Sequence, residues 1–173
     1  MQQVLKNIET QPITIGSLRQ ALPKSAKVIL YDSLPEYGSI EGVFGRKKSL
    51  VILYQLHDEG GRKTEGMGHY STILKLGNGK YEFFSSYGFS PEQEINKTHS
   101  GGKLIKLLGK NVVRSSVRLQ QRFNSNTCGR WAAARCILRD VPLQIFLKHF
   151  AQRLTLQEPD DIITLATLFL FRH

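Results

Sequence analysis

A chain of 173 residues, of which 40% are hydrophobic, is long enough to bury the core of one compact domain. Lysine and arginine number 24 against 14 aspartates and glutamates, and the net charge of +10 indicates either a polyanionic partner such as nucleic acid or a solvated basic surface. No apolar run has membrane-spanning length and the N-terminus is unlike a signal peptide, so we expect a protein that is neither secreted nor bound to a membrane.

The N-terminal third predicts a short helix and a buried strand. Ser17 can cap a helix over residues 18–21, and Pro23 limits that helix soon afterwards. Residues 49–56 (SLVILYQL) form an apolar run rich in β-branched residues, which favours a strand buried on both faces.

A hairpin is the clearest local feature of the chain. The polar, glycine-rich segment 57–68 predicts a loop that leads into a strand over residues 69–76. The sequence Gly-Asn-Gly at 77–79 predicts a tight turn onto a further strand at residues 80–86, because glycine and asparagine tolerate positive φ angles.

The second half predicts one more strand followed by helices. A glycine-interrupted basic stretch at residues 100–110 precedes an alternating segment, 111–119, that favours a strand. Helices are expected over residues 128–139, after Pro142, and over residues 160–171. Strands in the middle of the chain followed by helices predict an α+β domain, with a mixed or antiparallel sheet of four or five strands flanked by helices.

The two cysteines are Cys128 and Cys136, which lie too far apart along one predicted helix for an intrahelical disulfide. We therefore expect at least one free thiol and a reducing compartment. Cys128 begins the helix, where partly positive backbone amides stabilise the thiolate that attacks a carbonyl, and Gly129 leaves room for a substrate backbone. The alternative is that Cys128 is a buried small apolar residue, as we expect of Cys136.

A nucleophilic cysteine needs an imidazole within hydrogen-bond reach. The segment Gly68-His69-Tyr70 opens a strand directly after a glycine-rich loop, and this context places His69 beside a cleft. The other histidines lack such a context and are expected to be ordinary surface or core residues: His57, His99, His149 and His173.

Three segments, in order and approximate spacing, resemble the adenovirus protease family: residues 68–70 (GHY), 84–90 (FSSYGFS) and 121–129 (QRFNSNTCG). The family has Gly-His-Trp or Gly-x-His-Trp at a strand start, Phe-acid-x-Phe-Gly at a strand end, and a glutamine seven residues before a Cys-Gly helix start. The resemblance covers residues 42–139, and residues 41–44 also resemble relatives from virophages and other double-stranded DNA viruses. It implies the papain-like fold of adenain and the ubiquitin-like proteases, in one domain over residues 1–173.

The resemblance implies a cysteine endopeptidase in which Cys128 attacks the scissile carbonyl and His69 takes up the proton and returns it to the leaving amine. Gln121 is implied to stabilise the oxyanion, although Gln120 beside it offers an alternative register. The substrate is expected to contact four further residues: Gly68, Tyr70, Asn124 and Gly129. No metal-binding or nucleotide-binding motif is present, so we expect no required cofactor.

The position that orients the histidine departs from the family. Relatives carry an acid there, whereas this chain has Ser85, whose hydroxyl stabilises an imidazolium less than a carboxylate does. Several arrangements stay open: Ser85 acting directly or through water, Ser86, Asp58 or Glu65 in its place, or a Cys-His dyad. Glu82 is disfavoured because three positions along a strand put it on the opposite face.

The resemblance predicts a viral maturation protease that cleaves capsid or scaffold precursors, acts in the host cytoplasm or viral factory, and is packaged in the virion as a monomer. Tyr70 replaces the family's tryptophan and keeps an aromatic wall. No cysteine lies between Leu56 and Thr127, which argues against the disulfide-linked activating peptide of adenovirus protease, while stimulation by DNA stays open. The alternatives are a protease for ubiquitin-like modifiers and a catalytically inactive, basic nucleic-acid-binding domain on the same scaffold.

Overall fold

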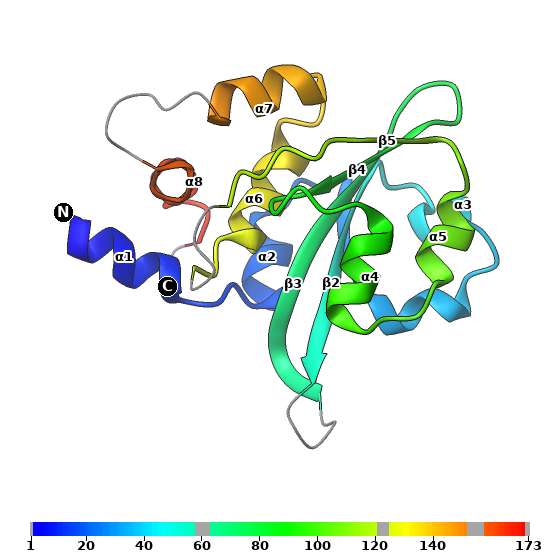
Figure 1. Ribbon diagram of the computed structural model, residues 1–173, viewed down its shortest axis with the longest axis horizontal. Helices are drawn as coiled ribbons and strands as arrows, with labels where there is room; N and C mark the ends of the chain where they lie inside the picture. Colours follow the sequence, from blue (N-terminus) through cyan, green and yellow to red (C-terminus); the bar gives the residue numbers. More distant parts are fainter. Residues whose placement is uncertain (1, 58–62, 121–124, 152–157, 172–173) are drawn as a thin grey trace.

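The structure is a computed structural model that describes residues 2–57, 63–120, 125–151 and 158–171 (Figure 1). Its centre is a mixed sheet in which five strands follow one another in chain order. The strands are β1 (Ala26–Leu30), β2 (Ser49–His57), β3 (Lys63–Lys75), β4 (Tyr81–Ser85) and β5 (Val112–Arg114). The outer pairs β1/β2 and β4/β5 are parallel, and β2, β3 and β4 are antiparallel. The predicted α+β class is confirmed.

Helices precede, interrupt and follow these strands. They are α1 (Gln2–Thr10), α2 (Ile15–Ala21), the 3₁₀ helix η1 (Tyr31–Glu36), α3 (Ile40–Phe44), α4 (Pro91–Thr98), α5 (Lys103–Leu108), α6 (Cys128–Ile137), α7 (Leu143–Ala151) and α8 (Pro159–Ala166). No helix of the described residues is both long enough and apolar enough to cross a bilayer.

The predicted hairpin is present. Asn78 and Gly79 adopt φ angles of 61° and 69°, and the Leu76 amide donates to the Lys80 carbonyl across the turn at 2.9 Å. Strand β3 is longer than expected because it starts at Lys63, inside the segment predicted as a loop, and pairs there with His57 after a register shift in β2. Strand β5, in contrast, keeps only three residues of the predicted segment.

The observed helix starts agree with the predicted ones only in part. Helix α6 begins at Cys128 as predicted. Helix α2 begins earlier than expected, because the hydroxyl of Thr14, and not that of Ser17, caps it and accepts from the Ser17 amide at 3.1 Å. Helices α1, α4 and α5 were not predicted, although α4 begins with Ser90 and Pro91 in a capping box, which is a sequence-level start signal.

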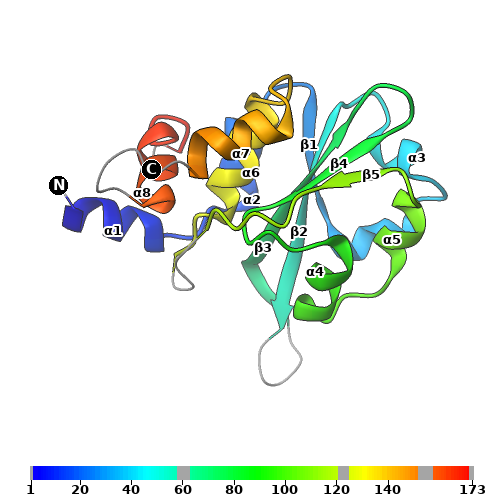
Figure 2. The same ribbon diagram turned by 45° about the horizontal axis from the view of Figure 1, so that its top comes forward.

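Two layers of helices cover the two faces of the sheet (Figures 1 and 2). On one face η1, α3, α4 and α5 enclose a hydrophobic cluster with Ile52, Tyr54 and Ile73. On the other face α2 and α6 pack on Val51, Leu53 and Tyr70. Because successive side chains of a strand point to opposite faces, His69 faces the α4 layer and Tyr70 faces the α6 layer.

Candidate active site

Cys128 lies at the N-terminal end of α6, in the first helical position. The first intrahelical hydrogen bond runs from the Trp131 amide to the Thr127 carbonyl at 3.0 Å, so the amides before Trp131 have no acceptor within the helix. Thr127 is itself fixed by its hydroxyl, which donates to Asp160 at 2.7 Å. The sulfur of Cys128 therefore lies at the electropositive end of a well-anchored helix.

His69 comes to this helix end from the central strand β3. Its neighbour Gly68 packs so closely on β2 that a Cβ atom there would lie 2.1 Å from the Tyr54 carbonyl oxygen. The Gly68 carbonyl oxygen in turn lies 4.0 Å from the Cys128 sulfur, and His69 and Cys128 line the same cavity, where the sulfur raises the pKa of the imidazole. The sheet thus brings together the two groups that the sequence pairs, although they are about sixty positions apart.

The imidazole of His69 is held on both of its faces. Its ring centroid lies 5.0 Å from that of Tyr87 and 6.4 Å from that of Tyr54, with interplanar angles of 37° and 24°. The hydroxyl of Tyr54 accepts from Ser71 at 3.2 Å, which ties this aromatic wall to β3. The ring therefore has little freedom to turn away from the sulfur.

Glu94 of helix α4 supplies the carboxylate that contacts the imidazole. Its Oε1 lies 2.9 Å from His69 Nε2, and its side chain is 1% exposed. Since Nε2 is engaged by Glu94, the other ring nitrogen is the one left for Cys128. A Cys-His-Glu arrangement results, with each residue on a different element.

Ser85 does not contact the imidazole in the way the sequence suggested. Its hydroxyl accepts from the Tyr87 amide at 3.2 Å, and the hydroxyl of Ser86 donates to Gln120 at 2.9 Å. Asp58 and the side chain of Glu65 lie outside the described residues. The acid thus comes from the helix that follows β4, whereas the family pattern places it at the end of the strand.

A signal in the sequence could have revealed Glu94. The buried residues of α4 are Pro91, Glu94, Ile95 and Thr98, at the i, i+3, i+4 and i+7 spacing of one inward face. A glutamate at an inward position is uncommon unless it has a partner. This residue was missed because helix α4 itself was not predicted.

The electrostatics of the three groups are coupled. Burial by itself lowers the pKa of His69, but the Glu94 carboxylate and the Cys128 sulfur outweigh burial and raise this pKa to about 10. At neutral pH the imidazole is therefore protonated and lies between a carboxylate and a sulfur. A cationic imidazole and a helix N-terminus together are the surroundings that favour a thiolate.

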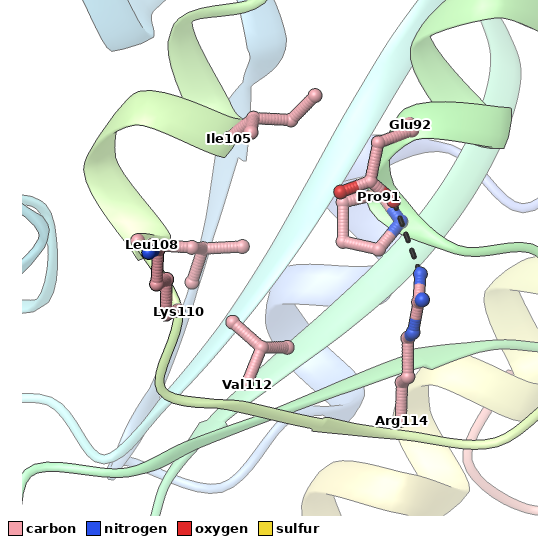
Figure 3. A pocket seen from close by; sticks show the side chains of 8 residues that line it. Pro91, Glu92, Ile105, Leu108, Lys110, Val112 and Arg114 are labelled. Carbon is pink, nitrogen blue, oxygen red and sulfur yellow. Dashed lines mark hydrogen bonds and ion pairs between the residues drawn. The ribbon is translucent and has the colours of Figure 1, made fainter.

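A cavity of about 260 Å³ gives access to these groups. Its lining comes from four segments and comprises Gly68, His69, Tyr87, Phe89, Glu94, Lys97, Thr98, Ser125, Asn126 and Cys128. A larger groove of about 490 Å³ lies between α4, α5 and β5, with Pro91, Ile105, Leu108 and Val112 at its base and the Glu92–Arg114 ion pair at one side (Figure 3). The described lining of that groove includes neither thiol nor imidazole, so the smaller cavity is the one with reactive groups.

Two residues expected beside the substrate pack elsewhere. Tyr70 faces the α6 layer, where its hydroxyl donates to the Ile13 carbonyl at 2.9 Å. Gly129 lies against the same residue, because a Cβ atom there would be 2.9 Å from Ile13 Cβ. Both residues pack against Ile13, in the segment before α2, and neither is part of the described cavity lining.

Of the glutamine and asparagine residues predicted for the site, Gln121 and Asn124 lie outside the described residues, whereas the alternative Gln120 is described. Gln120 is fully buried, and its amide donates to the Ser125 carbonyl at 2.9 Å while its oxygen accepts from Ser86. Gln120 therefore supports the segment that leads to Cys128 from inside the protein and does not face the cavity.

Both cysteines are free, in agreement with the prediction of at least one free thiol, and their surroundings differ. Cys136 is completely buried two turns along α6, and burial raises the pKa of its thiol to about 12. Cys128 is 9% exposed and lines the cavity. In the described part of the chain, no group of three or more histidine, cysteine or acidic side chains is arranged to hold a metal ion.

No protein-family model matches this chain. The chain is similar to uncharacterized protein V9 of Sputnik virophage, with 25% identity over 179 aligned residues that cover 95% of this chain and 98% of V9. The similarity extends over nearly the full length of both proteins, and it connects the chain with a virophage protein.

Proposed function

We propose that this chain is a cysteine endopeptidase in which Cys128 is the nucleophile, His69 the general acid and base, and Glu94 the residue that orients His69. The observation that carries this proposal is the meeting of the three side chains, from α6, β3 and α4, at one cavity. A buried histidine–carboxylate pair loses hydration and is weak support for a fold, so stability alone gives little reason to place it beside a thiol.

The geometry supports an acyl-transfer reaction in two halves. In the first half, the Cys128 thiolate forms a bond to the scissile carbonyl carbon, and the protonated His69 gives its proton to the leaving amine as the C–N bond breaks. In the second half, water attacks the thioester while His69 accepts a proton from it, and the acid product leaves as the C–S bond breaks. Throughout, Glu94 stabilises the imidazolium through its contact with Nε2.

The oxyanion of each half-reaction would be stabilised at the start of α6. The amide of Cys128 belongs to the helix end without intrahelical acceptors and is suitably placed for this role. Gln121 remains the proposed side-chain donor.

The proposed substrates are capsid or scaffold precursors of a virus, cleaved as virions mature. The similarity to a virophage protein supports a viral context, and the resemblance to adenovirus protease supports a maturation role. A protease for ubiquitin-like modifiers is the alternative enzyme, and a monomer in the host cell and virion is the proposed working form.

DNA is a proposed second partner, because a row of three lysines lies at the end of the sheet opposite the cavity: Lys48, Lys75 and Lys80. Backbone hydrogen bonds join their strands side by side: Lys75 donates to the Lys48 carbonyl and Leu76 to the Lys80 carbonyl, both at 2.9 Å. This row lies about 20 Å along the sheet from His69, so a polyanion bound there would leave the cavity open. The alternative interpretation of the same row of lysines is a catalytically inactive DNA-binding domain.

Incubation with the capsid precursor encoded by the same virus tests the proposal. We expect the wild-type protein to cleave the precursor at defined bonds, Cys128→Ala to abolish cleavage, and the matched variant Cys136→Ala to retain it. Cleavage that survives in a folded Cys128→Ala protein would refute the proposal. Where the precursor is not cleaved by any form, a thiol-reactive peptide probe decides: an enzyme is labelled at Cys128 in a His69-dependent manner, and an inactive domain is not.

A further inference from the structure

The cavity carries one cationic side chain that the proposed mechanism does not use. Lys97 lines it together with His69, Glu94 and Cys128. Of the other three groups, the His69 imidazolium and the Glu94 carboxylate offset each other. Lys97 is exposed, and within the described parts of the chain it forms no ion pair.

Helix α4 holds this lysine in a defined place. Its start is closed by a capping box between Ser90 and Gln93, and its buried face is anchored by Ile95. Lys97 follows Glu94 by three positions and so lies on nearly the same side of the helix, one turn further along. Glu94 is fixed by its contact with His69, so the backbone from which Lys97 extends is held beside the cavity.

A carboxylate is the group that such a site would attract. The Lys97 ammonium attracts an anion bound in the adjacent cavity, most strongly at low salt, because the side chain is exposed and water and ions screen it. It also repels lysine and arginine side chains of a bound peptide. The aromatic side of the cavity, formed by Tyr87 and Phe89, offers no competing carboxylate.

We propose that Lys97 makes this chain selective for peptide bonds flanked by an acidic side chain, aspartate or glutamate, within about three residues of the cleaved bond. A lysine side chain spans about 6 Å, which reaches residues adjacent to the bond at Cys128 and not distant parts of a substrate. The inference rests on the proposed function, and it adds the chemical class of the preferred substrate.

Alkylation of Cys128 tests the charge of the cavity without any substrate. Iodoacetate and iodoacetamide both transfer a two-carbon group to the thiolate and release iodide, and they differ in the negative charge of the first. We expect the ratio of the iodoacetate rate to the iodoacetamide rate to fall about fivefold in Lys97→Glu at low salt. The matched variant Lys110→Glu, in the larger groove, should leave the ratio within twofold of the wild type. An unchanged ratio in Lys97→Glu would overturn the inference.

Cleavage of a mixture of peptides from digested cell protein, with the new ends identified by mass spectrometry, tests selectivity. Aspartate and glutamate should be enriched near the bonds cut by the wild-type protein, and lysine and arginine near those cut by Lys97→Glu. Cys128-dependent cleavage with the same preference in both proteins, or with no acidic preference in the wild type, contradicts the inference and leaves the protease intact. Where no form cleaves the mixture, the thiol-reactive peptide probe decides on the protease, and the alkylation ratio still reports on Lys97.

Discussion

Two buried ion pairs, one on each face of the sheet, have similar chemistry and different surroundings. Arg135 of α6 binds both carboxylate oxygens of Glu82 on β4, at 2.5 and 2.9 Å, and its remaining donors reach the carbonyls of Leu138 and Val141. Every group of that pair has a partner inside the protein. The His69–Glu94 pair, in contrast, lines a cavity together with the Cys128 thiol.

The difference predicts different consequences for the loss of each pair. The Arg135–Glu82 pair is bonded entirely within the protein and joins α6 to the sheet, so its loss should lower the free energy of unfolding. The His69–Glu94 pair lies at the cavity, so its loss should lower the reactivity of Cys128. Four changes break or sharpen this comparison.

The largest effect is expected from Glu82→Ala. Removing this carboxylate leaves the Arg135 guanidinium buried without its charge partner, and breaking such a pair costs about 3–5 kcal/mol of unfolding free energy. Urea denaturation followed by circular dichroism measures it. In the fraction that remains folded, the rate of Cys128 alkylation should stay within about threefold of the wild type.

Glu94→Gln should act on reactivity with the fold retained. The amide keeps the size of the side chain but cannot stabilise the imidazolium, and we expect peptide cleavage to fall about 100-fold, which corresponds to about 2.7 kcal/mol. The measurement is kcat/KM on any peptide that the wild type cleaves. A Glu94→Gln protein with wild-type kcat/KM would remove Glu94 from the mechanism and leave a Cys-His dyad.

The pH dependence of stability should follow His69. Its pKa in the folded protein, about 10, lies above that of an unfolded histidine, near 6.5, so the protonated form stabilises the fold. This contribution is complete below about pH 6.5 and is lost as the pH rises through about 10. The stability difference between wild type and Glu94→Gln, on the order of 2 kcal/mol at pH 6, should therefore shrink by pH 10.5 in urea titrations.

The smallest effect is expected from Ser85→Ala. Its hydroxyl accepts from the Tyr87 amide, and a turn of this kind contributes about 1 kcal/mol or less. Cleavage should fall by less than about threefold, through a small shift of Tyr87. A loss as large as that of Glu94→Gln would return Ser85 to the position of the third catalytic group.

The two halves of the site differed in how far the sequence could predict them. Cys128 and His69 each sit in a local pattern, a helix start and a strand start after a glycine, and local patterns are readable along the chain. Glu94 contacts His69, which lies 25 positions earlier on a different element, and no local sequence pattern predicts that these two side chains meet. The hairpin followed from its turn residues, whereas the order of the sheet and strand β1 were not predicted, and α1 and α5 are short helices that tertiary packing stabilises more than their own propensity does.

The close approach of β2 and β3 at Gly68 has a consequence for how the site is assembled. Since a single methyl group there would collide with the Tyr54 carbonyl, the spacing between imidazole and sulfur depends on how tightly two strands lie together. An alanine at this position would wedge the strands apart and carry the imidazole with it, disabling the chemistry while every reactive atom is still present. The proposed reaction thus depends on the rigidity of the sheet.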